Sequence, residues 1–240
     1  VDEGNAIITT FQLSKDWDNG FSLWMAYANQ DVTDAHSGTS STQTSNYSDY
    51  ATFDRQNPNN ATSNYEIEHD WKLRASWRHA FFEDYETRVE LFMNSRSGRH
   101  FSYTYGYSNG LGNQYRNQSA FGIHESAADD EGTLFYVPET DASGNVTLTS
   151  DPNVTYTAGF DIAGLNSYLH STGLIGYAGE IAPRNEFDSP WSTQFDLRFQ
   201  QEFPAFFPNG ARGIFYMDIE NLGNLLNSDW GRSEGVRYEY

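Results

Sequence analysis

The sequence lacks cysteine, so neither a disulfide framework nor a cysteine-based metal site can be proposed for it. It also lacks a run of about 18 apolar residues, which means that no transmembrane helix can be drawn. Basic residues are scarce, because 14 Lys and Arg stand against 33 Asp and Glu, and the formal net charge is −19. That charge repels the phosphates of nucleic acid, so nucleic acid is set aside as a partner.

Recognisable catalytic motifs are lacking as well. The six His residues show no HExxH or other paired ligand spacing, and the sequence contains no GxSxG elbow, P-loop or phosphate-binding GxGxxG motif. Carboxylate pairs exist, as in any acidic chain, but nothing singles out one pair as a general acid and base. We therefore expect that the protein is not an enzyme and holds no cofactor.

Aromatic residues are abundant, with 17 Phe, 16 Tyr and 6 Trp, and they favour β-strands. The clearest strand pattern covers residues 65–81, where odd positions such as Leu73 and Trp77 are mostly apolar and even positions are mostly charged. Side chains alternate between the faces of a strand, so the pattern predicts one apolar and one polar face. Further strands are predicted at residues 6–15, 21–30, 87–105, 191–203 and 213–222, and a seventh begins near residue 232.

The connections between these strands alternate in length. Short, turn-like links cover residues 16–20, 82–86 and 204–212, whereas long links cover about 31–64 and 106–190. Short turns at one end and long loops at the other are typical of an all-β, antiparallel transmembrane β-barrel with long extracellular loops. Aromatic residues crowd the short-turn end, which fits an interfacial girdle, although aromatic core residues beside turns would give the same pattern. They are Trp17, Phe21, Phe81, Phe82, Tyr85, Phe203, Phe206 and Phe207.

A soluble β-sandwich is the alternative fold, because its strands also alternate apolar and polar faces. The length of the strand at residues 65–81 favours the barrel, since a tilted spanning strand needs about 9–11 residues and soluble strands average about 5–6. The corresponding alternative function is a secreted carbohydrate-binding module that recognises its ligand through aromatic side chains.

Several later segments resemble the end of the barrel of Oar-like TonB-dependent receptors. They include DPNVTY at 151–156, IAPRN at 181–185, SPW at 189–191 and MDIENL at 217–222. The resemblance covers about residues 137–230, and the earlier strands match only in pattern. It implies a 22-stranded barrel with an N-terminal plug, located in the bacterial outer membrane. It also implies uptake of a nutrient, such as a siderophore, saccharide or peptide, with energy from the TonB complex.

The resemblance further implies that outer-membrane lipid, lipopolysaccharide, the plug and TonB are partners. Neither a plug nor a TonB-contacting segment is recognisable here, and six strands plus a partial seventh cannot close such a barrel. We therefore expect residues 1–240 to be the C-terminal part of the barrel of a longer protein. The alternative that Tyr240 is the true terminus stays open, because residues 233–240 resemble the C-terminal assembly signature of outer-membrane proteins.

Charged side chains on the polar face are the candidate lining of the lumen. They either pair with one another or with the plug, or they form a path for the substrate. They are Glu66, Glu68, Asp70, Lys72, Arg74, Arg78, Arg88, Glu90, Arg96, Asp196 and Arg198.

The long loop at residues 106–190 is strongly acidic, and its densest cluster is Asp129, Asp130 and Glu131. Calcium prefers carboxylate oxygens, so this cluster is a candidate for structural calcium. No EF-hand spacing is present, and a solvated acidic loop is the alternative. Tyr105, Tyr107 and Tyr115 near the base of the loop are candidates for capturing an extracellular ligand. They would equally suit an outer aromatic girdle.

Overall fold

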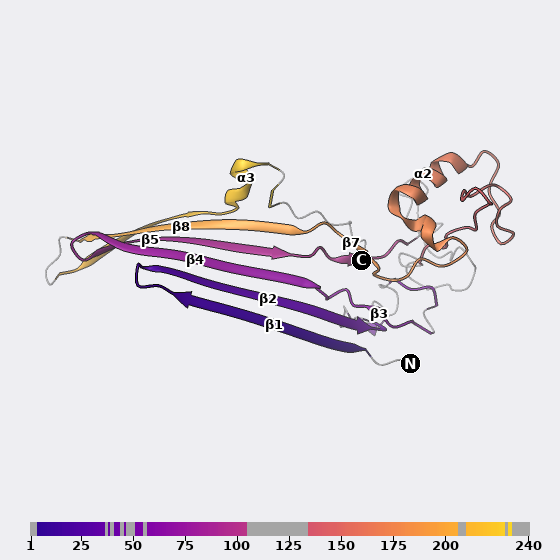
Figure 1. Cartoon of the computed structure of the whole chain (residues 1–240). Coiled ribbons are helices and arrows are strands. Elements are labelled where there is room, and N and C mark those ends of the chain that lie inside the picture. Colours follow the sequence, from indigo (N-terminus) through magenta and orange to yellow (C-terminus); the bar gives the residue numbers. More distant parts are fainter. Residues whose placement is uncertain are drawn as a thin grey trace.

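The fold is dominated by one antiparallel β-sheet. A computed structural model describes residues 4–36, 38, 41–43, 46, 51–54, 57–104, 134–205, 210–228 and 230–231 (Figure 1). The sheet order is β1-β2-β4-β5-β8-β9, and every neighbouring pair is antiparallel. The strands are β1 (Asn5–Asp16), β2 (Phe21–Asp34), β4 (His69–Phe82), β5 (Tyr85–Arg96), β8 (Ser192–Pro204) and β9 (Arg212–Ile219). The all-β prediction is therefore confirmed.

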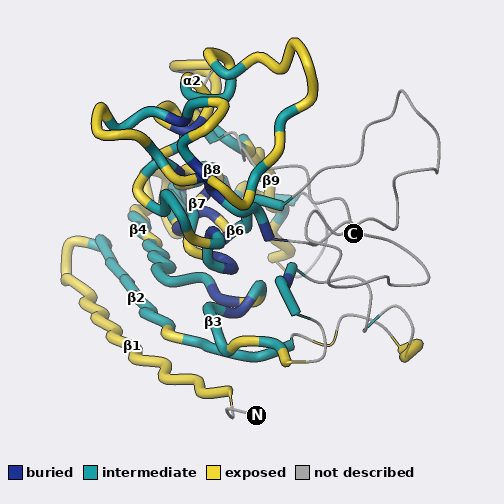
Figure 2. The backbone as a smooth tube through the Cα atoms, turned by 90° about the vertical axis from the view of Figure 1, so that its right-hand side faces the viewer, coloured by how far each residue is buried: buried dark blue, intermediate teal, exposed yellow. Residues whose placement is uncertain are grey.

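The sheet is open in the part of the chain that the structure describes. β1 pairs only with β2, and β9 pairs only with β8. The short strand β3 (Ala61–Thr62) pairs with the last two residues of β2, Thr33 and Asp34. In Figure 2 the sheet is seen as a curved layer whose outer strand, β1, is exposed along its length. Both edge strands thus present unpaired backbone groups along one side.

The predicted tight turns at residues 16–20 and 82–86 lie together at one end of the sheet. Between β1 and β2, the Asn19 side chain accepts a hydrogen bond from the Phe21 N–H at 3.1 Å. Gly20 has φ +83°, and a Cβ at this position would lie 2.1 Å from the Arg78 carbonyl oxygen. Only glycine meets both demands, which explains its place in this turn. The turn between β4 and β5 needs only two residues, Glu83 and Asp84, and Glu83 also has a positive φ.

The register of the strands joins the apolar positions into continuous rows across the sheet. One row runs Leu13, Met25, Leu73, Met93 and Phe195. The next row contains Leu23, Ala75, Leu91, Leu197 and Ile219, and a third contains Phe21, Trp77, Val89, Phe199 and Met217. All of these residues have odd numbers. We call their side the odd face, and the opposite, mostly polar side the even face.

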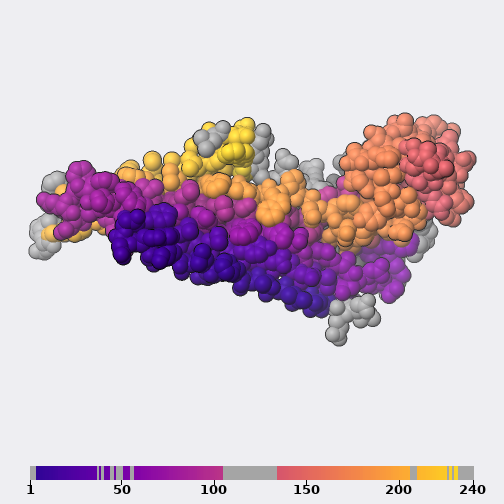
Figure 3. Space-filling view, viewed as in Figure 1, coloured from indigo at the N-terminus to yellow at the C-terminus, as the bar shows by residue number. Residues whose placement is uncertain are grey.

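The buried apolar core lies away from this sheet, in a cap formed by residues 134–188. Its centre consists of Val137, Val146, Leu169, Leu174 and Ala182. The cap contains helix α2 (Ile162–Thr172) and the short 3-10 helix η2 (Leu174–Tyr177), and it sits at the end of the sheet opposite the tight turns (Figures 1 and 3). β7 (Phe187–Asp188) leaves the cap and pairs with β6 (His100–Phe101).

Several sequence-based boundaries differ from the observed ones. The strand predicted at 65–81 begins at His69, because Glu66 N–H donates to the Ser63 carbonyl at 3.1 Å and turns the chain there. The strand predicted at 87–105 ends at Arg96. The chain after β9 forms α3 (Leu222–Leu226), and residues 134–188 of the predicted long loop form a packed unit with a buried core. None of the described helices is long and apolar enough to cross a membrane.

Candidate functional site

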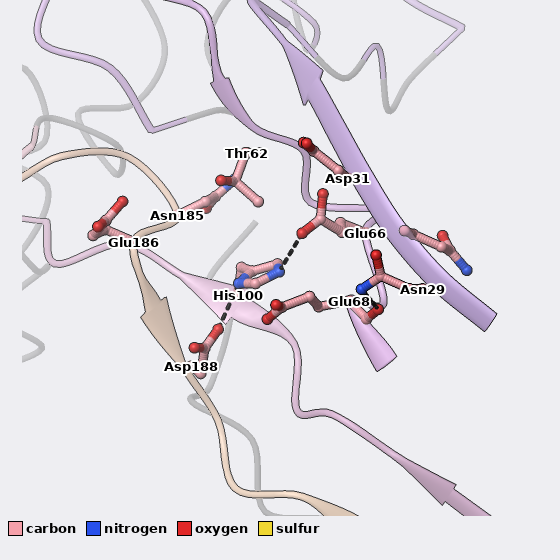
Figure 4. Close-up of a pocket in the computed structure, with 10 residues that line it drawn as sticks. Asn29, Asp31, Thr62, Glu66, Glu68, His100, Asn185, Glu186 and Asp188 are labelled. Atoms are coloured by element: carbon pink, nitrogen blue, oxygen red, sulfur yellow. Dashed lines mark hydrogen bonds and ion pairs between the residues drawn. The ribbon is translucent and has the colours of Figure 1, made fainter. Parts of the chain in front are cut away.

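A polar pocket of about 400 Å³ lies where the sheet meets the cap. Its walls come from the end of β2, the turn before β4, β6 and the last residues of the cap (Figure 4). Asn29, Gln30, Thr62 and Asn185 supply neutral polar groups. The other lining residues are Asp31, Glu66, Glu68, His100, Glu186 and Asp188. We call this cavity the rim pocket.

His100 is the central group of the rim pocket and connects two carboxylates. Its Nε2 lies 3.0 Å from Glu66 Oε1, and its Nδ1 lies 2.5 Å from Asp188 Oδ1. Figure 4 shows the two carboxylates on opposite sides of the ring. His100 is 7% exposed and Glu66 is 6% exposed. Both ring nitrogens of His100 therefore lie within hydrogen-bonding distance of a carboxylate oxygen.

The backbone fixes Glu66 in this position. The turn that begins at Ser63 carries Glu66 toward the end of β2, where the Val32 N–H donates to its second carboxylate oxygen. Each oxygen of the buried carboxylate therefore has a donor, which offsets the cost of removing it from water. Nearby, Glu68 lies 3.3 Å from His69 Nε2, at the start of β4.

A second set of contacts fixes the cap to the sheet beside the rim pocket. Arg184 Nη2 lies 3.0 Å from Asp34 Oδ1 at the end of β2, and it also donates to the Asp34 carbonyl. Asn185 Nδ2 donates to the Thr62 carbonyl at 2.7 Å, and the Asn185 N–H donates to Ser102 Oγ at 2.9 Å. Among the described residues, Nε and Nη1 of the buried Arg184 have no hydrogen-bond partner. The contact between Arg184 and Asp34 therefore fixes the position of the cap on the sheet more than it adds to the free energy of folding.

The chemistry of the rim pocket is that of an acceptor-rich cavity. Five carboxylates face it, and two of them contact the ring nitrogens of His100. Such a cavity repels anions and can accept hydrogen bonds from ammonium groups or from hydroxyl groups. In the part of the chain that the structure describes, no group of three or more His, Asp or Glu side chains is arranged to hold a metal ion.

Most of the predicted lumen-lining charges lie on the even face, and several of them form ion pairs there. Lys72 Nζ lies 2.9 Å from Asp70, Arg74 lies 3.5 Å from Glu90, and Arg88 lies 3.1 Å from Glu86. Arg198 binds Asp218 through two hydrogen bonds of 2.6 and 2.8 Å. Arg78 lies opposite Arg88 in register, Arg96 lies opposite Asp70, and Asp196 accepts from the Asn221 N–H at 2.8 Å. Glu66 and Glu68 precede β4 and belong to the rim pocket instead.

A second pocket of about 430 Å³ opens on the even face near the tight turns. Trp24, Arg74 and Phe92 line it together with Leu23, Ser14, Asp16 and Ser22. Sequence reasoning did not single out Trp24 and Phe92, although two large aromatic residues at even positions of otherwise polar strands were a usable signal. It also missed His100 and Asp188, for which the sequence offers no signal.

The remaining predicted site residues lie outside the described residues. These are the candidate ligand-capture residues Tyr105, Tyr107 and Tyr115 and the candidate calcium ligands Asp129, Asp130 and Glu131.

Comparison of the chain with protein-family models, with curated proteins and with solved structures finds no match. A functional proposal therefore depends on the geometry described above and on the resemblance between sequence segments.

Proposed function

We propose that this chain is part of a transmembrane β-barrel in the bacterial outer membrane, where it belongs to a TonB-dependent receptor that imports a nutrient. The observation that carries the proposal is the odd face. Each of its three rows joins apolar side chains from five neighbouring strands, and among the described residues no second sheet packs against it. Every buried apolar side chain that the structure describes lies outside the six long strands.

A soluble sandwich needs a second layer whose inner face meets the first, about 10 Å away. The described residues supply only α3 near the odd face, where Gly223 approaches the Phe195 ring. Large apolar side chains of the edge strands are strongly exposed, including Phe11 at 55% and Phe215 at 55%. Hydrocarbon would cover these groups without any second protein layer, as it does in membrane barrels.

The aromatic side chains of the odd face support a particular depth of the sheet in the proposed membrane. Near the cap, Tyr27 packs on Trp71 and donates or accepts a 2.8 Å hydrogen bond with His69. Near the tight turns, His79 stacks on Trp77 and meets Phe81 edge-on. Ten residues separate His69 from His79, which is about 33 Å of strand and agrees with the roughly 9–11 residues that a tilted strand needs to cross the bilayer core. Aromatic groups with polar tips favour the two boundaries of that core.

The open edges of the sheet support a barrel completed by other residues. Unpaired backbone groups are very costly in hydrocarbon, so β1 and β9 need neighbouring strands. The number of these strands, the plug and the contact with TonB follow from the resemblance alone. Two of the resembling segments contribute to the cap. Residues 151–156 include Asp151 inside the cap, and residues 181–185 include Arg184 and Asn185, which fix the cap to β2 and β3.

A matched pair of single-cysteine variants tests the membrane part of the proposal, because the chain contains no native cysteine. Ala75 lies on the odd face in register with Leu91, and Ala26 lies on the even face in register with Lys72. A fluorophore on Ala75→Cys in vesicle-embedded protein should be quenched by a lipid-chain nitroxide, whereas one on Ala26→Cys should be quenched only by aqueous iodide. Quenching of both labels by iodide alone would favour the soluble carbohydrate-binding alternative.

The transport part of the proposal needs a separate measurement. The complete receptor should be recovered in the outer-membrane fraction and should cross-link to TonB in energised cells. Protein that is recovered in the outer-membrane fraction but does not cross-link to TonB would agree with the proposed barrel. It would contradict the assignment of the protein as a TonB-dependent receptor.

A further inference from the structure

On β2 and β5, the even face carries two large aromatic residues that the polar pattern of these strands does not explain. Trp24 of β2 and Phe92 of β5 lie in register on either side of Arg74 of β4. Their neighbours on the same face along these strands include Ser22, Lys72 and Glu90. An aromatic side chain on a water-exposed face gains nothing from solvent, so a partner for these rings is expected.

The space beside these side chains has the size of a ligand site. The pocket of about 430 Å³ on the even face falls within the usual range of about 300–1,000 Å³ for small-molecule sites. Its walls combine two aromatic rings with the hydroxyl groups of Ser14 and Ser22, the Asp16 carboxylate and the Arg74 guanidinium. Such sites commonly combine apolar walls with a few convergent polar groups.

The polar groups of the pocket have capacity left for a ligand. The Arg74 side chain is 58% exposed and lies 3.5 Å from Glu90, a long contact that uses one of its amino groups. The Ser22 hydroxyl pairs with Ser76 at 2.6 Å and keeps a further lone pair. The pocket therefore offers hydrogen-bond donors from Arg74, acceptors from Asp16, and serine hydroxyl groups that can both donate and accept.

These features discriminate among ligand classes. A multiply charged anion would be repelled by Asp16, by Glu90 and by the net charge of −19. A wholly apolar ligand would leave the pocket's polar groups buried without partners. A sugar ring matches both the aromatic and the polar walls of the pocket. Its C–H face packs on an aromatic ring, and its hydroxyl groups form hydrogen bonds with the carboxylate, the guanidinium and the serine hydroxyl groups.

We propose that the Trp24–Arg74–Phe92 pocket binds a neutral saccharide, with the sugar ring against one or both aromatic side chains. In the framework of the proposed function, this names a saccharide as the imported nutrient and places a sugar subsite on the wall of the lumen. The binding itself does not depend on transport, because all of the lining residues belong to the sheet described above.

Equilibrium dialysis of the detergent-folded complete protein tests this inference, with radiolabelled maltose, cellobiose and chitobiose as probes at concentrations up to about 10 mM. At least one of these disaccharides should bind. Trp24→Ala and Phe92→Ala should each weaken that binding about tenfold, as expected for the loss of an aromatic contact of about 1.4 kcal/mol. Tyr216→Ala is the matched control, because Tyr216 is an exposed aromatic residue on the even face outside the pocket.

Two outcomes overturn the inference: none of the three probes binds, or binding is the same in Trp24→Ala, Phe92→Ala and the wild type. Trp24→Phe guards against misfolding, since it keeps an aromatic wall and should retain most of the affinity. Heat-modifiable migration of the same samples in gels reports barrel formation independently. A folded barrel without sugar binding would overturn this inference alone, whereas sugar binding by a protein that forms no barrel would overturn the proposed function alone.

Discussion

His100 Nδ1 lies 2.5 Å from Asp188 Oδ1, and this contact joins strand β6 to the segment that leaves the cap. The same imidazole ring reaches Glu66 on its other side, so one buried group connects three chain segments. The rim pocket is therefore also a junction between the cap and the sheet, and its integrity can be tested through the mobility of the cap.

His100→Gln should loosen this junction. A neutral amide cannot replace the charge-assisted bonds to two carboxylates, and one such bond contributes about 2 kcal/mol. The backbone N–H of Ser189, which donates to the Arg99 carbonyl at 2.9 Å, should then exchange with solvent about thirtyfold faster. His170→Gln, on the exposed surface of α2, is the matched control and should leave this exchange rate unchanged. Equal rates in both variants would show that His100 does not hold the junction.

Arg184→Ala should destabilise the docking of the cap. The substitution leaves Asp34 without its cation, and breaking a buried pair in this way costs about 3 kcal/mol. Arg212→Ala removes the half-exposed pair with Glu202 and should cost less than about 1 kcal/mol. The urea denaturation midpoint measures both effects, and limited proteolysis between the sheet and the cap reports the docking of the cap in Arg184→Ala. Similar midpoints for the two variants would contradict the role assigned to Arg184.

Ala75→Asp should impair membrane assembly, whereas Ala26→Asp should not. In the proposed membrane arrangement, Ala75 meets hydrocarbon, where a charged side chain costs up to about 2–4 kcal/mol at mid-depth and less for Asp. Ala26 lies in register with Lys72 on the even face, where a carboxylate gains a cation as neighbour. The measurement is the fraction of protein that reaches a heat-modifiable form in the outer membrane. Equal yields for the two variants would count against the assignment of the odd face to lipid.

Asp151 should make the cap sensitive to acid. Its carboxylate is 2% exposed and accepts from Tyr136 Oη at 2.8 Å, Glu139 N at 3.0 Å and Asn153 N at 2.8 Å. Burial raises the pKa of this carboxyl, but the backbone and hydroxyl donors outweigh burial, so that the pKa lies below its ordinary value. A lowered pKa stabilises the folded state above the ordinary value of about 3.9, and this stability is lost as the pH falls through the lowered value.

The methyl NMR signals of the buried Leu169 and Leu174 should accordingly broaden or shift below about pH 4. Asp151→Asn has no carboxylate to protonate, so its cap should be weaker at neutral pH and should change less between neutral and acidic pH. An acid transition of the same size in wild type and variant would assign the effect to other carboxylates.

The sheet was largely predictable because a strand has a side-chain period of two. Leu73 and Arg74 are neighbours in sequence and necessarily face opposite sides, so alternation alone assigned both faces. The tight turn at Asn19 and Gly20 was equally readable, since its geometry demands these residue types. The start of β4 was misplaced because alternation continues through Tyr65 to Glu68, while a local hydrogen bond from Glu66 to Ser63 ends the strand pattern.

The rim pocket was not predictable as a unit. Glu66, His100 and Asp188 are separated by 34 and 88 residues, and no spacing rule brings them together. Their contact depends on the packing of the cap around Leu169 and Leu174, which directs the following segment back toward the sheet. The alternation of residue types along the chain carries no information about contacts between residues so far apart in the sequence.

By itself, the sequence determined which side chains share a face of the sheet and where the chain makes its tight turns, because both depend on residues close together along the chain. The tertiary structure alone decided which carboxylates meet His100, how Arg184 reaches Asp34, and which aromatic residues flank Arg74. Those contacts depend on the register of the strands and on the packing of the cap against the sheet. Both are determined by the sum of many interactions between residues that are far apart in the sequence.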